Sequence, residues 1–187
     1  MITRFFILLF KLNGWKIAGA FPQNVKKAVV IAAPHTSNWD FIYALAIFKL
    51  LKLKVRYLIK NEVNFFPLSI LIKNTGGIPV ERSKKQNLID QFVEVFNKED
   101  NLLVAFPAEG TRKKVDKWKS GFYYTALQAN VPVVPGYLDF SKKEGGFGEP
   151  IYLSGNKEED LKKIKMFYAD KVGKYPELFN IEGIKLD

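Results

Sequence analysis

The stretch "AVVIAAPHTSNWDFIYALAIFKLL", residues 28–51, joins two apolar segments through a short polar turn. Residues 28–33 have the length and composition of a buried strand. Residues 38–51 are long enough for a helix, and only Asp40, Tyr43 and Lys49 interrupt its apolar character. A helix that is apolar nearly all round is buried on most sides or touches lipid. The stretch therefore predicts a strand, a turn and a helix of that kind.

The same alternation continues along the chain and predicts an α/β fold. Further strands are expected at 55–59, 78–80, 102–106, 131–138 and 150–153, and further helices at 2–12, 67–73, 86–97, 122–130 and 158–171. We expect a mixed, mostly parallel sheet flanked by helices. A chain of 187 residues that is 48% hydrophobic can bury one sizeable core, so residues 1–187 are predicted to form a single domain. The glycine-rich residues 142–150 are expected to be a surface turn between two strands.

Composition limits the partners of the chain. It has 29 Lys and Arg against 19 acidic residues, and a net charge of +10 favours a nucleic acid, an acidic membrane surface or a phosphorylated substrate. No nucleic-acid-binding signature accompanies the charge, so we expect no nucleic-acid partner. The absence of Cys excludes disulfides and thiolate sites, and one His argues against a zinc site. We expect neither a metal nor a cofactor.

Residues 1–22 allow several interpretations. The apolar run at 5–10 resembles the core of a signal peptide, but basic and polar residues break it early, and it is shorter than the ~20 residues of a spanning helix. We favour a short amphipathic helix in a membrane interface, with Trp15 at the boundary. Its basic side chains would face anionic head groups: Arg4, Lys11 and Lys16. A first helix packed on the protein core is the alternative.

His35 is the only histidine, and Asp40 follows it five positions later. In one interpretation Asp40 caps its own helix behind Ser37, and His35 merely packs. In the other, Asp40 accepts a ring N–H from His35 and supports its use as a general base. Five residues turn a regular helix by about 140°, so the two side chains can meet only if His35 lies in the turn.

Two further clusters could bind a phosphate. Alternation in "GGIPVERSKK", residues 76–85, places Arg82 on the same side as Ile78 and Val80, although a solvated charged turn is equally compatible. The loop after residues 102–106 offers Glu109, Gly110, Thr111 and Arg112, whose backbone N–H groups and charge suit an anion or a polar head. Pro132 and Pro135 place the strand at 131–138 at a sheet edge or at the mouth of a site.

Together these blocks resemble the glycerophospholipid acyltransferase family, which includes bacterial 1-acylglycerol-3-phosphate acyltransferase. His35 and Asp40 match its H-x-x-x-x-D motif. The G-x-I-x-V-x-R block matches residues 76–82, the E-G-T-R block matches 109–112, and a late proline-bearing strand matches 131–135. Pro34 and Ala108 stand where the family usually has Asn and Pro.

The resemblance implies transfer of a fatty acyl group from acyl-CoA or acyl carrier protein to a hydroxyl of a lysophospholipid. His35 would act as general base and Asp40 would orient it. Arg82 and Arg112 would bind phosphate, Glu109 and Thr111 would position either the acceptor or the loop itself, and Gly110 would belong to the same substrate-binding loop. We expect an acyl groove lined by Phe residues and the helix after Asp40, and a protein held peripherally or monotopically on the cytoplasmic face of the cell membrane. The alternative is a basic lipid-binding protein without catalysis.

Overall fold

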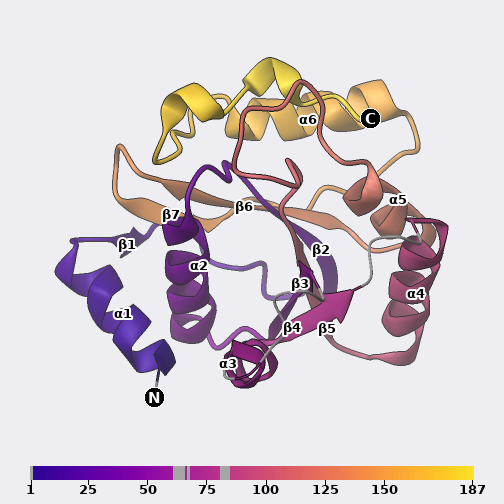
Figure 1. The fold of residues 1–187 in the computed structure, drawn as a ribbon. Coiled ribbons are helices and arrows are strands. Elements are labelled where there is room, and N and C mark those ends of the chain that lie inside the picture. Colours follow the sequence, from indigo (N-terminus) through magenta and orange to yellow (C-terminus); the bar gives the residue numbers. More distant parts are fainter. Residues whose placement is uncertain (1, 61–65, 67, 81–84) are drawn as a thin grey trace.

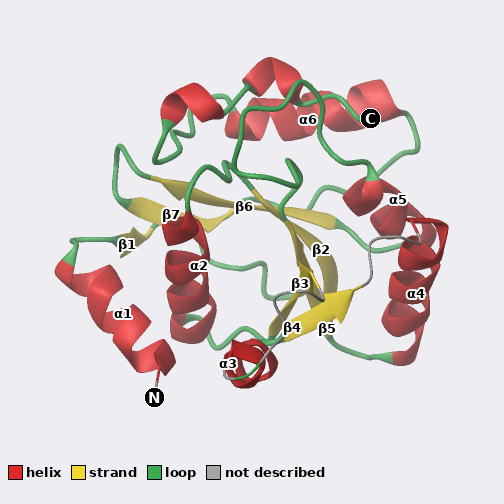
Figure 2. Ribbon diagram, in the orientation of Figure 1, coloured by secondary structure: helices red, strands yellow, loops and turns green. Residues whose placement is uncertain are grey.

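A seven-stranded sheet with helices on both faces forms the molecule, as the computed structural model shows for residues 2–60, 66, 68–80 and 85–187 (Figures 1 and 2). The strand order is β1-β7-β6-β2-β5-β3-β4. Every described neighbour pair is parallel except β6 and β7. Parallel strands joined by helices confirm the predicted single α/β domain with a mixed, mostly parallel sheet.

The elements are bounded as follows. The strands are β1 Lys16–Ile17, β2 Lys27–Ala32, β3 Val55–Lys60, β4 Gly77–Val80, β5 Leu102–Phe106, β6 Val133–Asp139 and β7 Glu144–Phe147. The helices are α1 Ile2–Leu12, α2 Asn38–Leu50, α3 Leu68–Thr75, α4 Lys85–Lys98, α5 Gly121–Gln128 and α6 Lys157–Tyr168, followed by short 3-10 turns at Pro176–Leu178 and Ile181–Gly183.

The central strand β2 contributes to a hydrophobic core on each face of the sheet. Val29 and Ile31 pack in the core shared with α4, α5 and α6, whereas Ala28 and Val30 pack in the core shared with α1 and α2. Successive strand side chains point to opposite faces, so a strand covered on both sides must be apolar throughout. This is why residues 28–33 read as an unbroken apolar run.

Helix α2 lies between the sheet and α1, which explains its missing polar face. Leu45, Ala46 and Ile47 are buried. From α1, Phe6 and Phe10 join the same core, and the Phe10 ring lies 5.9 Å from that of Tyr43, between centroids. Burial on most sides, one of the two interpretations of this helix, is what the structure shows.

The sequence suggested that Trp15 lies at a membrane boundary, but the structure packs this side chain inside the protein. It is only 7% exposed, and its ring centroid lies 4.6 Å from that of Tyr43. The packed alternative therefore holds for one face of α1. The opposite stripe of the helix, Phe5, Leu8 and Leu12, is exposed. In the described part of the chain, no helix combines the length and the apolar character that crossing a bilayer requires.

The prediction of a surface turn at 142–150 is wrong for its central part. Residues 144–147 form β7, which pairs with both β6 and β1. A Cβ on Gly146 would lie 2.4 Å from the backbone nitrogen of Gly19, so glycine permits the chain to pass this close. The strand expected at 150–153 is reduced to a single bridge between Ile151 and Val133.

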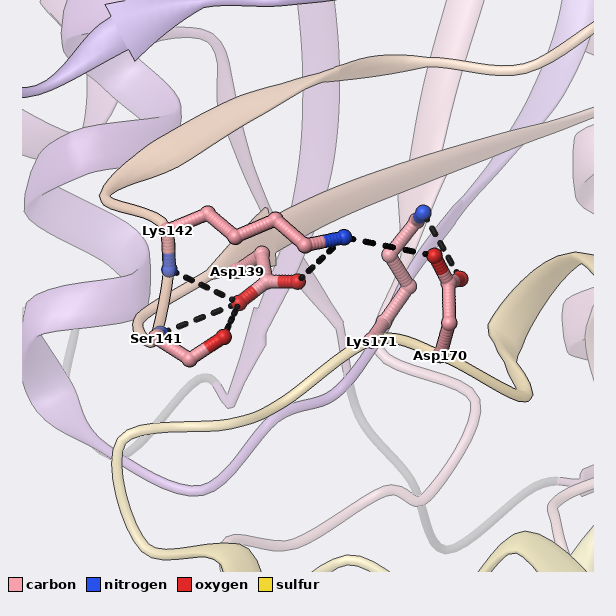
Figure 3. A network of polar contacts seen from close by, with 5 residues as sticks. All are labelled: Asp139, Ser141, Lys142, Asp170 and Lys171. Carbon is pink, nitrogen blue, oxygen red and sulfur yellow. Dashed lines mark hydrogen bonds and ion pairs between the residues drawn. The ribbon is translucent and has the colours of Figure 1, made fainter.

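A short turn joins β6 to β7, and Asp139 holds it (Figure 3). Asp139 Oδ1 accepts hydrogen bonds from the Ser141 backbone N–H at 3.0 Å, the Ser141 hydroxyl at 2.6 Å and the Lys142 N–H at 3.2 Å. Strand β6 is also not a sheet edge, because it lies between β2 and β7. Of the two sequence interpretations for its prolines, only the mouth of a site remains.

Candidate active site

The polar turn between β2 and α2 is closed by a capping box. The Trp39 N–H donates to Ser37 Oγ at 3.2 Å, and the Ser37 N–H donates to Asp40 Oδ2 at 2.8 Å. Such reciprocal bonds satisfy backbone donors that a helix start otherwise leaves without partners. Asp40 therefore does cap its own helix, as the first interpretation of the sequence required.

The same oxygen of Asp40 also lies beside the imidazole of His35. The distance from His35 Nδ1 to Asp40 Oδ2 is 3.4 Å, and the Thr36 N–H donates to that oxygen at 2.8 Å. The two interpretations are thus not exclusive, because His35 lies in the turn and Asp40 serves the helix and the ring together. With the carboxylate on the Nδ1 side, Nε2 is the ring nitrogen left to take up a proton.

The Asp40 carboxylate is buried, with an exposed fraction of 5%. Its second oxygen, Oδ1, makes no hydrogen bond to any described residue. The His35 side chain is 16% exposed and lines a cavity. An accessible imidazole backed by a buried carboxylate is the arrangement expected of a general base.

Glu109 lies beneath the turn in the loop that follows β5. Its carboxylate oxygen Oε2 accepts the His35 backbone N–H at 2.9 Å, and the residue is 3% exposed. Burial is the main cause that raises the pKa of Glu109 to about 8; the negative charge of Asp40 raises it further, and the His35 N–H opposes the shift. Near neutral pH the carboxyl is therefore mostly protonated. Of the two sequence suggestions for this residue, the contact corresponds to positioning the loop.

The other predicted residues of this loop are placed differently. Gly110 has a φ of +71°, a left-handed conformation that favours glycine. Thr111 is exposed, and its Oγ1 accepts the Lys113 N–H at 3.4 Å. Arg112 is exposed and lines the cavity that His35 lines. Arg82 lies outside the described residues.

A cavity of about 270 Å³ lies under α2, against the face of the sheet. Polar groups line it at one end: His35, Asp40 and Arg112. The remaining lining is largely apolar and includes Phe41, Ala44, Leu45, Phe48, Leu138 and Phe147. The predicted contribution of phenylalanines and of the helix after Asp40 agrees with this lining.

The contribution of β7 to the cavity was not predicted, whereas for the strand that contains β6 the mouth of a site was one of the two interpretations. Gly136, Tyr137 and Gly146 line it. A Cβ on Gly136 would lie 3.0 Å from the Ile31 carbonyl oxygen and 3.4 Å from a ring carbon of Phe147. Glycines inside strands mark such close approaches, and this was the one sequence signal available. An apolar chamber with an imidazole and a carboxylate at its polar end suits a ligand with an apolar chain and a reactive polar group.

An acyl group is a ligand of that kind, and the comparisons with known proteins support acyl transfer. The chain belongs to the Acyltransferase family, whose model matches residues 16–139. It is also similar to the crystal structure of the 1-acyl-sn-glycerophosphate (LPA) acyltransferase PlsC from Thermotoga maritima, with a TM-score of 0.61 and 17% sequence identity over 89% of this chain and 74% of that one. At this identity the likeness concerns the fold. No curated protein matches the sequence.

Proposed function

We propose that the protein transfers a fatty acyl group from acyl-CoA or acyl carrier protein to a hydroxyl of lysophosphatidate or a related lysophospholipid, in phospholipid biosynthesis. The observation that carries this proposal is the His35–Asp40 pair at the polar end of an apolar cavity. Family membership supports acyl transfer. The apolar lining supports a fatty acyl group, and Arg112 at the same end supports a phosphorylated acceptor.

The proposed reaction needs no covalent enzyme intermediate. His35 Nε2 takes the proton of the acceptor hydroxyl while its oxygen attacks the thioester carbonyl. The tetrahedral intermediate then breaks its C–S bond, and the imidazolium returns the proton to the departing thiolate. The products are an ester and a free thiol. Asp40 stabilises the imidazolium that forms between these steps, from 3.4 Å away.

A protonated Glu109 fits this mechanism because the turn then holds one full negative charge rather than two. An ionised Glu109 beneath His35 would disfavour the approach of an anionic acceptor. Arg112 would bind the acceptor phosphate at the cavity mouth, and Arg82 remains its proposed partner in this role. Thr111, exposed beside Arg112, remains a proposed contact of the acceptor.

We further propose that the protein acts at the cytoplasmic face of the cell membrane, attached to one leaflet. Phe5, Leu8 and Leu12 form an exposed apolar stripe on α1, and Arg4 and Lys11 are exposed beside it. Such a helix can lie in a bilayer interface, while a net charge of +10 attracts anionic lipid. A product and an acceptor that are lipids require contact of this kind.

A thiol-release assay tests the proposal. Purified protein mixed with an acyl thioester and lysophosphatidate should release free thiol and form phosphatidate, and His35→Ala should lower the rate by roughly 10²–10⁴. Lys162→Ala, at an exposed position on α6, is the matched control and should retain the rate. Turnover that persists in folded His35→Ala protein would contradict the mechanism.

The non-catalytic alternative predicts a different result. A basic lipid-binding protein would bind anionic vesicles but release no thiol with lysophosphatidate, glycerol 3-phosphate or other lysophospholipids as acceptor. Offering each acceptor with both acyl-CoA and acyl carrier protein separates the absence of activity from a wrong choice of substrate.

A further inference from the structure

The chain beyond the matched family region returns to the polar turn between β2 and α2 that carries His35, which we call the active-site turn. Residues 140–187 lie outside the 16–139 match, and α6 within them packs on the sheet. Tyr168, at the end of α6, is fully buried, and its hydroxyl donates to the Gly136 carbonyl at 3.0 Å and the Ile31 carbonyl at 3.4 Å. These two carbonyls lie on β6 and β2, close to the turn that carries His35. The end of α6 is thus fixed relative to that turn.

Residues 170–175, which we call the C-terminal strap, follow this anchor. The Phe140 N–H donates to the Val172 carbonyl at 2.9 Å, which joins the strap to the end of β6. Lys142 adds a surface ion pair, with its Nζ 3.4 Å from Asp170 Oδ2 (Figure 3). Exposed pairs of this kind contribute little to stability, so the backbone hydrogen bond is the firmer link.

The strap contacts the active-site turn at Thr36. The Tyr175 N–H donates to Thr36 Oγ1 at 3.2 Å. Gly173 is buried against the same side chain, and a Cβ there would lie 2.9 Å from Thr36 Oγ1 and 3.1 Å from Pro34 Cβ. Glycine is therefore what allows the strap to lie this close to the turn.

Thr36 itself connects the strap to Asp40. It is 3% exposed, and its backbone N–H donates to Asp40 Oδ2, the oxygen that lies beside His35. A second contact reaches the first turn of α2, because Lys174 Nζ lies 5.0 Å from the centroid of the Trp39 ring. Displacement of Thr36 would therefore move a donor that fixes the carboxylate, and with it the partner of the imidazole.

From these contacts we infer that Thr36 and Gly173 are positioning residues: the C-terminal strap holds the turn in the geometry in which Asp40 orients His35. The expected change in kcat rests on the proposed function, whereas the orientation of the His35 ring can be measured without any activity. His35 is the only histidine, so in tag-free protein its ring-nitrogen NMR signals report the imidazole tautomer without ambiguity. A carboxylate beside Nδ1 favours the tautomer with the proton on Nδ1.

The test uses two variants that disturb the contact from opposite sides. Thr36→Val removes the acceptor of the Tyr175 N–H at nearly constant volume, and Gly173→Ala inserts a methyl group where Thr36 lies. Each should move the His35 ring-nitrogen signals toward the average of the two tautomers. Each should also lower kcat by about tenfold or more with KM changed less than about twofold, because small displacements of catalytic groups cost rate rather than binding. Thr36→Ser, which keeps the hydroxyl, should restore the signals and most of the rate.

Gly121→Ala is the matched control, since a Cβ at Gly121 meets nothing within 4 Å. It should leave both the signals and kcat unchanged. Wild-type ring signals and wild-type kcat in folded Thr36→Val and Gly173→Ala would overturn the inference and reduce the strap to a stabilising contact, visible only in Tm. If the wild-type protein releases no thiol, the proposed function fails, and the ring signals still decide on the strap.

Discussion

One carboxylate oxygen makes three of the polar contacts within the active-site turn. Asp40 Oδ2 accepts the N–H groups of Thr36 and Ser37 at 2.8 Å each and lies 3.4 Å from the His35 ring. A buried carboxylate is tolerated when it is hydrogen-bonded in this way. Helix capping and orientation of the ring are therefore one interaction, and a change at Asp40 disturbs both.

Replacement of Asp40 should separate these two contributions in part. Asp40→Asn keeps an oxygen that can accept the two backbone N–H groups but loses the negative charge beside the ring. We expect the weakened cap to lower stability modestly, by about 1–2 kcal/mol. We expect kcat to fall strongly, because the charge that stabilises the imidazolium is lost. Chemical denaturation and thiol release measure the two effects. A variant that loses stability but keeps kcat would show that Asp40 only caps the helix.

The protonation of Glu109 predicts a pH dependence of stability. Its pKa rises from 4.5 to about 8 on folding, so between these values the folded protein holds a proton that the unfolded chain has released. The contribution is fully present below pH 4.5 and is lost progressively as the pH rises from 4.5 through 8, a difference of about 5 kcal/mol.

Glu109→Gln is neutral at every pH and serves as the reference for this prediction. The Tm of the wild-type protein minus that of Glu109→Gln should fall as the pH is raised from 5 to 9. Thermal unfolding of both proteins across this range measures it, and subtraction removes the titration of other groups. A constant difference would mean that Glu109 is ionised in the folded protein.

The sequence predicted His35 and Asp40 better than it predicted Glu109. Spacing alone required His35 to lie in the turn if it was to meet Asp40, and the structure has this arrangement. The sequence around Glu109 indicates a loop that offers polar groups to a ligand, but not the contact with His35, because only the folded sheet brings the residue after β5 beneath the residue after β2. Residues 74 positions apart meet in that contact, and no local pattern encodes it.

At the scale of elements, α2 covers the sheet and forms one wall of the cavity. Ala44 and Phe48 both line it, one and two turns beyond Asp40. Four residues of helix correspond to about 6 Å along the axis. In the proposed reaction, side chains at these two positions would therefore meet the acyl chain at different depths from the reactive end.

This arrangement predicts a change of acyl-chain preference. Ala44→Phe should fill the cavity near the reactive end and lower kcat/KM for long acyl thioesters more than for short ones. Phe48→Ala should enlarge the far end and shift the preference toward longer chains, with a discrimination of about 1–3 kcal/mol at most for small changes in length. The ratio of kcat/KM for two chain lengths measures the preference. A general loss of activity cancels in this ratio, so no separate control is needed. Equal effects on all lengths would place the acyl chain elsewhere.

The elements that the sequence missed are those that depend on tertiary contact. Apolar runs long enough to bury on both faces identified β2, β5 and β6. Strand β7 contains Gly145 and Gly146, residues of low strand propensity, and it forms because β1 and β6 supply partners on both sides. Strand β1 has only two residues, too few for any periodic signal.

At the scale of the whole molecule, the exposed apolar side chains and the net charge both favour an anionic membrane surface as partner. Phe5, Leu8 and Leu12 are spaced three and four residues apart, and so share one face of α1, opposite the face that packs on α2. Two independent contributions would favour membrane binding. One is transfer of such a stripe into a bilayer interface, and the other is attraction of a +10 protein to anionic lipid. They can be separated by experiment.

The stripe is tested by Phe5→Ser, Leu8→Ser and Leu12→Ser combined. Burial of each side chain contributes about 1–2 kcal/mol, so the triple variant should bind vesicles of anionic phospholipid at least tenfold more weakly. The matched control is a second triple variant that changes exposed apolar residues outside α1: Leu127→Ser, Tyr152→Ser and Met166→Ser. Vesicle sedimentation measures both, and equal loss in the two variants would contradict a specific role for α1.

The charge contribution is tested by salt. Raising the ionic strength from 0.01 to 1 M shortens the Debye length from about 30 to 3 Å, so attraction to anionic lipid should weaken while apolar insertion does not. The wild-type protein should retain part of its vesicle binding at high salt, and the triple variant of α1 should lose nearly all of it. Vesicles of neutral lipid should bind the wild-type protein weakly at every salt concentration. Binding of the wild-type protein that disappears completely at high salt would show that charge alone holds it on the membrane and that the stripe on α1 does not insert.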